Sequence, residues 1–392
     1  FVNGEVASTT VNQSLPEVVA KAAELYPDNQ YKSMTTATSY WGAFNWDRQM
    51  YALYNDPSVS TTSKTDAQKA DTKAAILNAD FRRAVYAAYS AHAVEAITLG
   101  EEHADGVIRN TLIPYTFQTT SDGRAYGSIV EKYAAELVAD YEGIDLNDGH
   151  DAWYNPELAK TFAERAKEEL GDSVSEWPIH IDVPVYAASE NQKNRQLAMK
   201  KSVEDAIGDY VVIDLQFLEG NSSVYYSSFY NQPTGEDNSI DLVFGAGWGP
   251  DYGDPLTYLH CFDVHDGDML NYSGINIESQ GQSEEQKAVL ETLGLNEVQE
   301  IVDQATAATG DERIELFAKA EAMLLTNGIL RPYSTSGANI TISKVKPFTV
   351  AYGLYGQAAY NQVPYFKYMQ LLDEPVTAAE YEAAKEAWMA GK

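Results

Sequence analysis

The feature that most constrains the fold is an alternation of strand and helix patterns between Pro178 and Phe244. Short apolar runs rich in β-branched residues predict strands at 179–185, 210–217 and 240–244, and helical patterns fill 191–207 and 222–230 between them. Strands that alternate with helices are typical of βαβ units, in which right-handed crossovers join parallel neighbours. We therefore expect an α/β fold with a mainly parallel sheet.

Capping signals predict further helices. Asn78 is a predicted N-cap for a helix that carries Phe81 on its apolar face, and Asn155 with Pro156 begins a helix that runs to about Leu170. Other patterns predict extended chain at 34–46 and 330–350, helices at 128–141, 295–307 and 311–325, a tyrosine-rich loop at 352–368, and a capping-box helix from Thr377 to Trp388.

The charge of the chain limits its partners. Asp and Glu number 58 against 27 Lys and Arg, which gives a formal net charge of −31. Such a surface repels nucleic-acid phosphates and anionic headgroups, so we expect no nucleic-acid partner and favour neutral or cationic ligands. No apolar run reaches the length of about 18 residues that a membrane-spanning helix needs. Cys261 is the single cysteine, so the fold must form without an intrachain disulfide.

Glycine, aromatic and acidic residues gather directly after the third predicted strand, between Gly245 and Pro255. Loops at the carboxyl ends of strands present ligand sites in open α/β sheets. Asp251 lies between Trp248 and Tyr252, which can form apolar walls around a cationic group. A charge-assisted hydrogen bond to an ammonium is worth about 1.5–3 kcal/mol. Alternatively, the two aromatic residues belong to the core and Asp251 caps the next turn; the residue pattern leaves both open.

Motifs for catalysis are scarce. The sequence contains no Gly-x-Ser-x-Gly elbow and no phosphate-binding loop. Asp251 and Asp254 could serve as a carboxylate pair in a hydrolase, but no residue that would activate water accompanies them in the pattern. We therefore expect the protein not to be an enzyme.

Residues of the types that bind metals occur close together between His260 and Asp268. They lack Cys-x-x-Cys or His-Glu-x-x-His spacing, so a polar loop with incidental histidines is favoured, and Cys261 is expected to be an inert buried thiol. The acidic run at 145–151 also departs from the calcium-loop pattern and predicts a turn. We expect no metal and no cofactor. The residues of the first segment are His260, Cys261, Asp263, His265, Asp266 and Asp268.

The stretch from Gly247 to Pro255, GWGPDYGDP, resembles the Gly-Trp-x-x-Asp-Tyr-x-(Asp/Glu)-Pro signature of the peptide-binding solute receptors of ABC importers. The helix start at 78–85 resembles the same family, although Phe81 and Tyr89 depart from its commoner Val and Ile. Segments 40–45 and 345–348 also follow the family's order. The tyrosine-rich style is most similar to streptococcal and related Gram-positive oligopeptide-binding lipoproteins.

The resemblance implies a periplasmic-binding-protein-like α/β fold of the class with an extra domain. It covers nearly all of this chain but only the later part of a family member. One complete α/β lobe and a partial second lobe are therefore expected. The implied division is 1–55 as the end of the first lobe, 56–340 as the second lobe, and 341–392 as the return to the first lobe with a C-terminal helix.

The function that the resemblance implies is a monomeric extracellular receptor, anchored to the cell membrane as a lipoprotein, which captures oligopeptides between two lobes and delivers them to ABC permease subunits. Asp251 would pair with the α-ammonium of the peptide beside Tyr252, and the main chain at Ala246, Gly247 and Trp248 would bond it like an added strand. The alternatives are a sugar or metal complex bound by the same fold, a surface hydrolase, and an interaction fragment.

Overall fold

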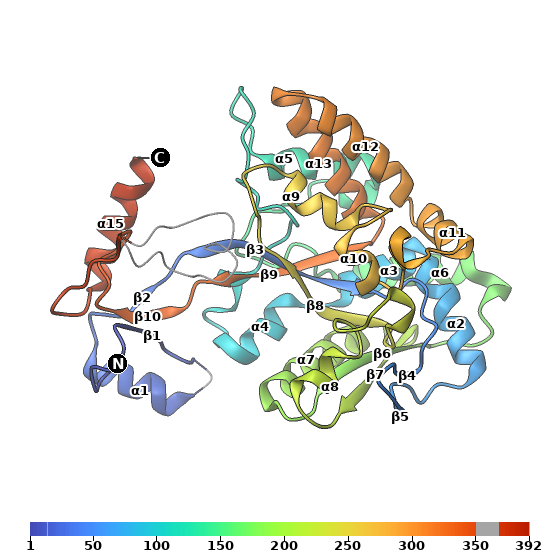
Figure 1. Ribbon diagram of the computed structural model, residues 1–392, viewed down its shortest axis with the longest axis horizontal. Coiled ribbons are helices and arrows are strands. Elements are labelled where there is room, and N and C mark those ends of the chain that lie inside the picture. Colours follow the sequence, from blue (N-terminus) through green and yellow to red (C-terminus); the bar gives the residue numbers. More distant parts are fainter. Residues whose placement is uncertain (14, 350–367, 392) are drawn as a thin grey trace.

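The computed structural model describes residues 1–13, 15–349 and 368–391. Figure 1 shows an elongated molecule with a smaller part at the chain termini and a larger body. Two long strands, β3 (Thr35–Phe44) and β9 (Leu330–Gly337), run from the smaller part into the body. Of the tyrosine-rich loop predicted at 352–368, all but Tyr368 lies outside the described residues.

The body contains the predicted βαβ unit. Strand β6 (Ile179–Tyr186) pairs in parallel with β7 (Val211–Leu218), and helix α7 (Glu190–Ile207) connects them. All four valine and isoleucine side chains at the odd positions of β6 from 179 to 185 are buried, as expected for a strand covered on that face. This part of the sequence-based prediction is confirmed.

The prediction that the third strand joins this parallel pair is wrong. Strand β8 (Leu242–Trp248) extends through the glycines and pairs antiparallel with β3, giving the order β8-β3-β9. Two glycines explain the choice of partner. A Cβ on Gly42 would lie 2.5 Å from the ring of Phe244, and one on Gly247 would lie 2.5 Å from the ring of Tyr40. Only glycine allows these rings to cross the neighbouring strand so closely.

A buried charge cluster holds the start of β8. Arg48 Nη1 lies 2.7 Å from Asp182 Oδ2 and 2.8 Å from Asp241 Oδ1, and Lys64 pairs with both carboxylates. The Asp241 backbone also donates to the carbonyl of Asp182 in β6 (3.1 Å) and accepts from Asn45 after β3 (2.8 Å). The chain therefore passes β6 at residue 241 and then follows β3, so within the predicted strand 240–244 the backbone hydrogen bond to the expected neighbour is made at Asp241 alone.

Helices cover the body, and several begin where the sequence predicts. Helix α6 (Pro156–Leu170) is capped by Asn155, whose side chain accepts from Leu158 N. Helix α3 (Ala79–Ala88) is capped by Asn78. Among residues 1–13, 15–349 and 368–391, no helix combines the length and apolar character needed to cross a membrane. The other helices of the body are α2 (Asp66–Leu77), α4 (Ala91–Leu99), α5 (Tyr126–Leu137), α8 (Ser222–Tyr226), α9 (Leu256–Leu259), α10 (Asp268–Tyr272), α11 (Glu284–Thr292), α12 (Leu295–Ala307) and α13 (Gly310–Thr326).

The smaller part has its own sheet and core. Its strands have the order β1-β10-β2. Val11, the residue directly after β1, and Ile342 of β10 pack with Ala22 of the neighbouring helix α1. Helix α15 stacks Tyr381 on Tyr31 of β2 with ring centroids 3.9 Å apart. The elements of the smaller part are β1 (Ser8–Thr10), α1 (Pro16–Leu25), β2 (Tyr31–Lys32), β10 (Ile340–Ser343) and α15 (Ala378–Ala390). A separate hairpin, β4 (Ala52–Leu53) with β5 (Asp56–Ser60), lies on the body.

Candidate functional site

The outer edge of β8 is the first component of the candidate site. Strand β3 is the one strand bonded to β8 in the described part of the chain, so the other edge of β8 ends the sheet. Ala246 is buried against the core, whereas Gly245 is exposed and Gly247 is half-buried. An edge without side chains at alternate positions lets another extended backbone approach and add a strand.

Asp251 follows this edge by three residues and is exposed. Its backbone N–H donates to Thr257 Oγ1 over 2.8 Å, which fixes the turn that carries the side chain. Among the residues that the structure describes, neither a hydrogen bond nor an ion pair engages the Asp251 carboxylate. Both carboxylate oxygens are therefore available to accept charge-assisted hydrogen bonds from a cationic ligand.

Asp254, the other carboxylate of the motif, is engaged within the fold. Its Oδ1 accepts from the backbone N–H of Leu256 (3.0 Å) at the start of α9. Arg313 of α13 binds it through two parallel contacts, Nε to Oδ2 at 2.9 Å and Nη2 to Oδ1 at 3.0 Å. The carboxylate that binds the backbone at the start of α9 is therefore that of Asp254 and not that of Asp251. This bidentate pair anchors the loop to α13 and leaves Asp251 as the free acid of the motif.

Trp248 and Tyr252 lie on either side of Asp251 in the sequence, and neither is a fully buried core residue. Tyr252 is 45% exposed, and Trp248 is half-buried. The Trp248 ring meets His260 edge to face, with centroids 5.2 Å apart and an interplanar angle of 78°. Of the two roles that the sequence leaves open, a fully buried core position is therefore excluded for both rings.

The structure also brings together three of the six potential metal-ligand residues between His260 and Asp268, a segment that the sequence predicts to be a polar loop with incidental histidines. The ligand atoms of His260, Cys261 and Asp268 all lie within 4.8 Å of one another. Burial raises the pKa of the Cys261 thiol well above its ordinary value, and Asp268 and Asp251 add to the shift. His265 instead pairs with Glu278, Nδ1 to Oε1 at 2.8 Å.

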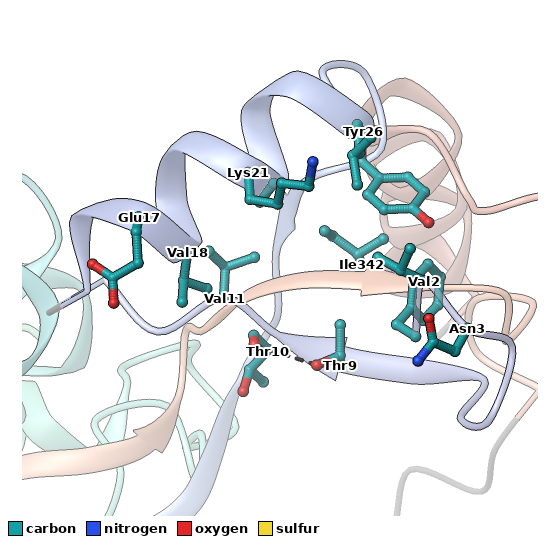
Figure 2. Close-up of a pocket in the computed structure, with 13 residues that line it drawn as sticks. Val2, Asn3, Thr9, Thr10, Val11, Glu17, Val18, Lys21, Tyr26 and Ile342 are labelled. Carbon is teal, nitrogen blue, oxygen red and sulfur yellow. Dashed lines mark hydrogen bonds between the residues drawn. The ribbon is translucent and has the colours of Figure 1, made fainter.

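A separate cavity of about 450 Å³ lies beneath α1 in the smaller part (Figure 2). Figure 2 shows Val11, Val18 and Ile342 facing one another between the helix and the strands. Glu17 and Lys21 also line it from α1. No local sequence pattern indicates this cavity, because it forms where strands distant in sequence meet α1. In Figure 1, α1 and β8 lie in different parts of the molecule.

Comparison with solved structures defines the class of fold. The substrate-binding domain of an oligopeptide ABC transporter from Bacillus anthracis matches 95% of this chain and 56% of its own, with a TM-score of 0.58 and 17% identity. OppA of Listeria monocytogenes, solved bound to peptide, matches 94% of this chain and 54% of its own, with a TM-score of 0.57 and 16% identity. The chain thus has the mixed α/β fold of OppA-like peptide-binding proteins and covers about half of it.

Sequence comparison specifies the relatives. The oligopeptide-binding protein SarA of Streptococcus gordonii is 32% identical over 373 residues, which are 94% of this chain and 53% of that protein. AliB of Streptococcus pneumoniae is 34% identical over 372 residues, 94% of this chain and 54% of that protein. No family model matches the chain. The chain is therefore related to oligopeptide-binding proteins of streptococcal type, as its motif indicates, and spans about half the length of these relatives.

Proposed function

We propose that this chain carries the peptide-binding site of an extracellular solute receptor of an ABC importer, and that it is not an enzyme. One observation carries the proposal: the open edge of β8 leads directly to Asp251, whose carboxylate is exposed and engaged by no described residue. The relatedness to oligopeptide-binding proteins supports the same ligand class.

In the proposed complex, an extended peptide lies beside Ala246, Gly247 and Trp248 as an added strand. Its main-chain groups bond with those of β8, so the interaction is independent of the peptide sequence. The α-ammonium is bound by Asp251, and Trp248 and Tyr252 shield the pair from water. Shielding strengthens the charge-assisted bond because the effective dielectric constant falls.

The remaining features concern the whole receptor. We propose that residues 56–340 form most of one lobe, to whose sheet and core β3 also contributes. The remainder of 1–55 and residues 341–392 belong to the other lobe, and closure of the two lobes encloses the peptide. The closed receptor, a monomer held at the cell surface by a lipid anchor, would then deliver the peptide to permease subunits. A surface hydrolase is less well supported, because Arg313 and the backbone N–H of Leu256 occupy Asp254, the second carboxylate it would require.

The test uses titration calorimetry on this chain to compare a peptide with a free N-terminus and the same peptide N-acetylated. Peptide concentrations up to about 1 mM detect dissociation constants up to about that value, which corresponds to a binding free energy of about 4 kcal/mol. Asp251→Ala is expected to weaken the free peptide at least tenfold and to leave the acetylated peptide unchanged. The matched control Asp266→Ala removes another exposed acid and should change neither. An equal loss for both peptides would contradict the ammonium role, and the absence of any binding would contradict a peptide site on this chain.

A further inference from the structure

Three side chains of different chemistry converge beside the loop that follows β8. The imidazole of His260, the thiol of Cys261 and the carboxylate of Asp268 place one ligand atom each within 4.8 Å of the other two. His260 Nε2 lies 3.8 Å from Asp268 Oδ2. Around a tetrahedral zinc ion, bond lengths of about 2.0–2.3 Å place neighbouring ligand atoms roughly 3.4–3.7 Å apart. The separations of the three atoms are thus at most about 1.4 Å larger than those around a bound metal.

The convergence depends on a tight return of the chain. His260 and Cys261 lie at the end of α9, and the chain then turns so that Asp268 comes back over them at the start of α10. Gly267 makes this turn possible, because a Cβ there would lie 2.6 Å from the carbonyl oxygens of both Cys261 and Asp263. Its N–H donates to the Asp263 carbonyl over 3.0 Å and closes the loop. The position of Asp268 is therefore set by the backbone.

The histidine is also oriented as a ligand. His260 Nδ1 lies 3.0 Å from the carbonyl oxygen of Leu256, an acceptor, so Nδ1 must carry the proton of this hydrogen bond. The other nitrogen, Nε2, then carries the free lone pair and lies 3.8 Å from Asp268 Oδ2. A backbone carbonyl that fixes the tautomer in this way is the usual outer partner of a metal-binding histidine.

We propose that His260, Cys261 and Asp268 bind a divalent cation of the zinc class, with a water molecule as the fourth ligand. Nitrogen, thiolate and carboxylate are the donors that zinc takes in proteins, and three protein ligands with one open position are a known arrangement. On binding, the metal replaces the proton of the Cys261 thiol, and that proton passes to solvent. The site does not depend on the proposed peptide function, since Asp251 is not one of its ligands.

The metal would also fix a side chain of the candidate peptide site. His260 meets Trp248 edge to face at a centroid distance of 5.2 Å, so a metal on Nε2 holds the imidazole against that indole. The site thereby stabilises the loop between β8 and α10. We expect the loop to exchange its amide hydrogens more slowly in the metal-bound protein.

The test uses Co²⁺ as the probe, because its bond to a thiolate gives a charge-transfer absorption in the near ultraviolet that carboxylates cannot produce. The titration is done at physiological ionic strength, where the attraction of the acidic surface for cations is screened. The absorption of the intact chain should saturate at one Co²⁺ per chain, and Zn²⁺ should remove it by displacing Co²⁺. Cys261→Ser should abolish the absorption. Asp268→Asn should weaken binding by more than the 10–100-fold that loss of an outer partner costs.

Matched controls come from the same loop. His265→Ala and Asp266→Asn remove a neighbouring histidine and acid outside the cluster and should leave the absorption intact. Circular dichroism of each variant separates loss of ligand from loss of fold, and the exposed Asp268→Asn keeps the test independent of the buried cysteine. Absence of the absorption in the unmodified chain would overturn the proposal and assign any Co²⁺ binding to the acidic surface. Binding that survives unchanged in Asp268→Asn would also overturn it, because Asp268 would then not be a ligand.

Discussion

Replacing Lys64 by Met removes one of two cations from the buried cluster that positions the start of β8. The side chains of Lys64, Asp182 and Asp241 are between 0% and 2% exposed, and Lys64 Nζ lies 3.2 Å from Asp182 Oδ2 and bonds to Asp241. Methionine keeps the length of the stem but leaves two carboxylates to share Arg48. Breaking a buried ion pair in this way costs about 3–5 kcal/mol because a charge is left uncompensated. This is a large part of the roughly 5–15 kcal/mol that stabilises a native protein.

The assay is urea unfolding followed by circular dichroism, with free energies from linear extrapolation. Adding Asp241→Asn to Lys64→Met removes the excess negative charge, so the double variant should be more stable than Lys64→Met alone. The control Lys201→Met breaks the pair with Asp205, whose side chains are 75% and 66% exposed, and should cost less than about 1 kcal/mol. A loss below about 1 kcal/mol for Lys64→Met, or simple additivity of the two substitutions, would refute the reasoning.

Three further predictions concern other parts of the fold. Burial raises the pKa of Glu321 to about 8, against hydrogen bonds from Tyr126 and the backbone that lower it. Because the pKa is higher in the folded state, the free energy of unfolding is greatest below the unfolded-state pKa and falls as pH rises from about 4.5 to 8, by up to about 5 kcal/mol. Urea unfolding at a series of pH values should show that Glu321→Gln reduces this pH dependence. An unchanged dependence of the unfolding free energy on pH would contradict the prediction. Arg313→Lys replaces the bidentate contact with Asp254 by a point charge, so amides of the loop after β8 should exchange faster in mass spectrometry, and unchanged exchange would show that Arg313 does not anchor the loop. Gly247→Val places its side chain on the Tyr40 ring and should lower the melting temperature by several degrees, as for a loss of about 1–3 kcal/mol; an unchanged melting temperature would show that the contact adapts freely.

Local features of the fold could be predicted from the sequence because their causes are local. Asn155, Pro156 and the apolar period after them specify α6, and the observed helix ends at Leu170 as expected. The capping box at Thr377 likewise begins α15. The partner of β8 could not be predicted, because it depends on rings and glycines about 200 residues apart, such as Tyr40 and Gly247, and periodicity within one strand carries no such information.

In the candidate site too, features with local causes could be predicted, and features that depend on distant residues could not. The motif around Asp251 placed an acid between two aromatic residues and left open whether these form a ligand site or part of the core; the structure exposes that acid at the end of a sheet edge. The role of Asp254 could not be predicted, since Arg313 lies 59 residues further along the chain. The sequence groups His260, Cys261 and Asp268 in one segment, but consensus metal spacing does not describe the turn closed at Gly267 that brings their ligand atoms together.

The central claim is that a peptide adds to the open edge of β8 with its N-terminus at Asp251. Hydrogen exchange of the backbone amides of residues 245–248, measured by NMR with and without a saturating short peptide, tests it most directly. The proposal predicts that the amides facing away from β3 become protected in the complex, and that Asp251→Ala reduces this protection at equal peptide concentration. Unchanged exchange along β8, with protection appearing elsewhere, for example around the cavity beneath α1, would contradict it.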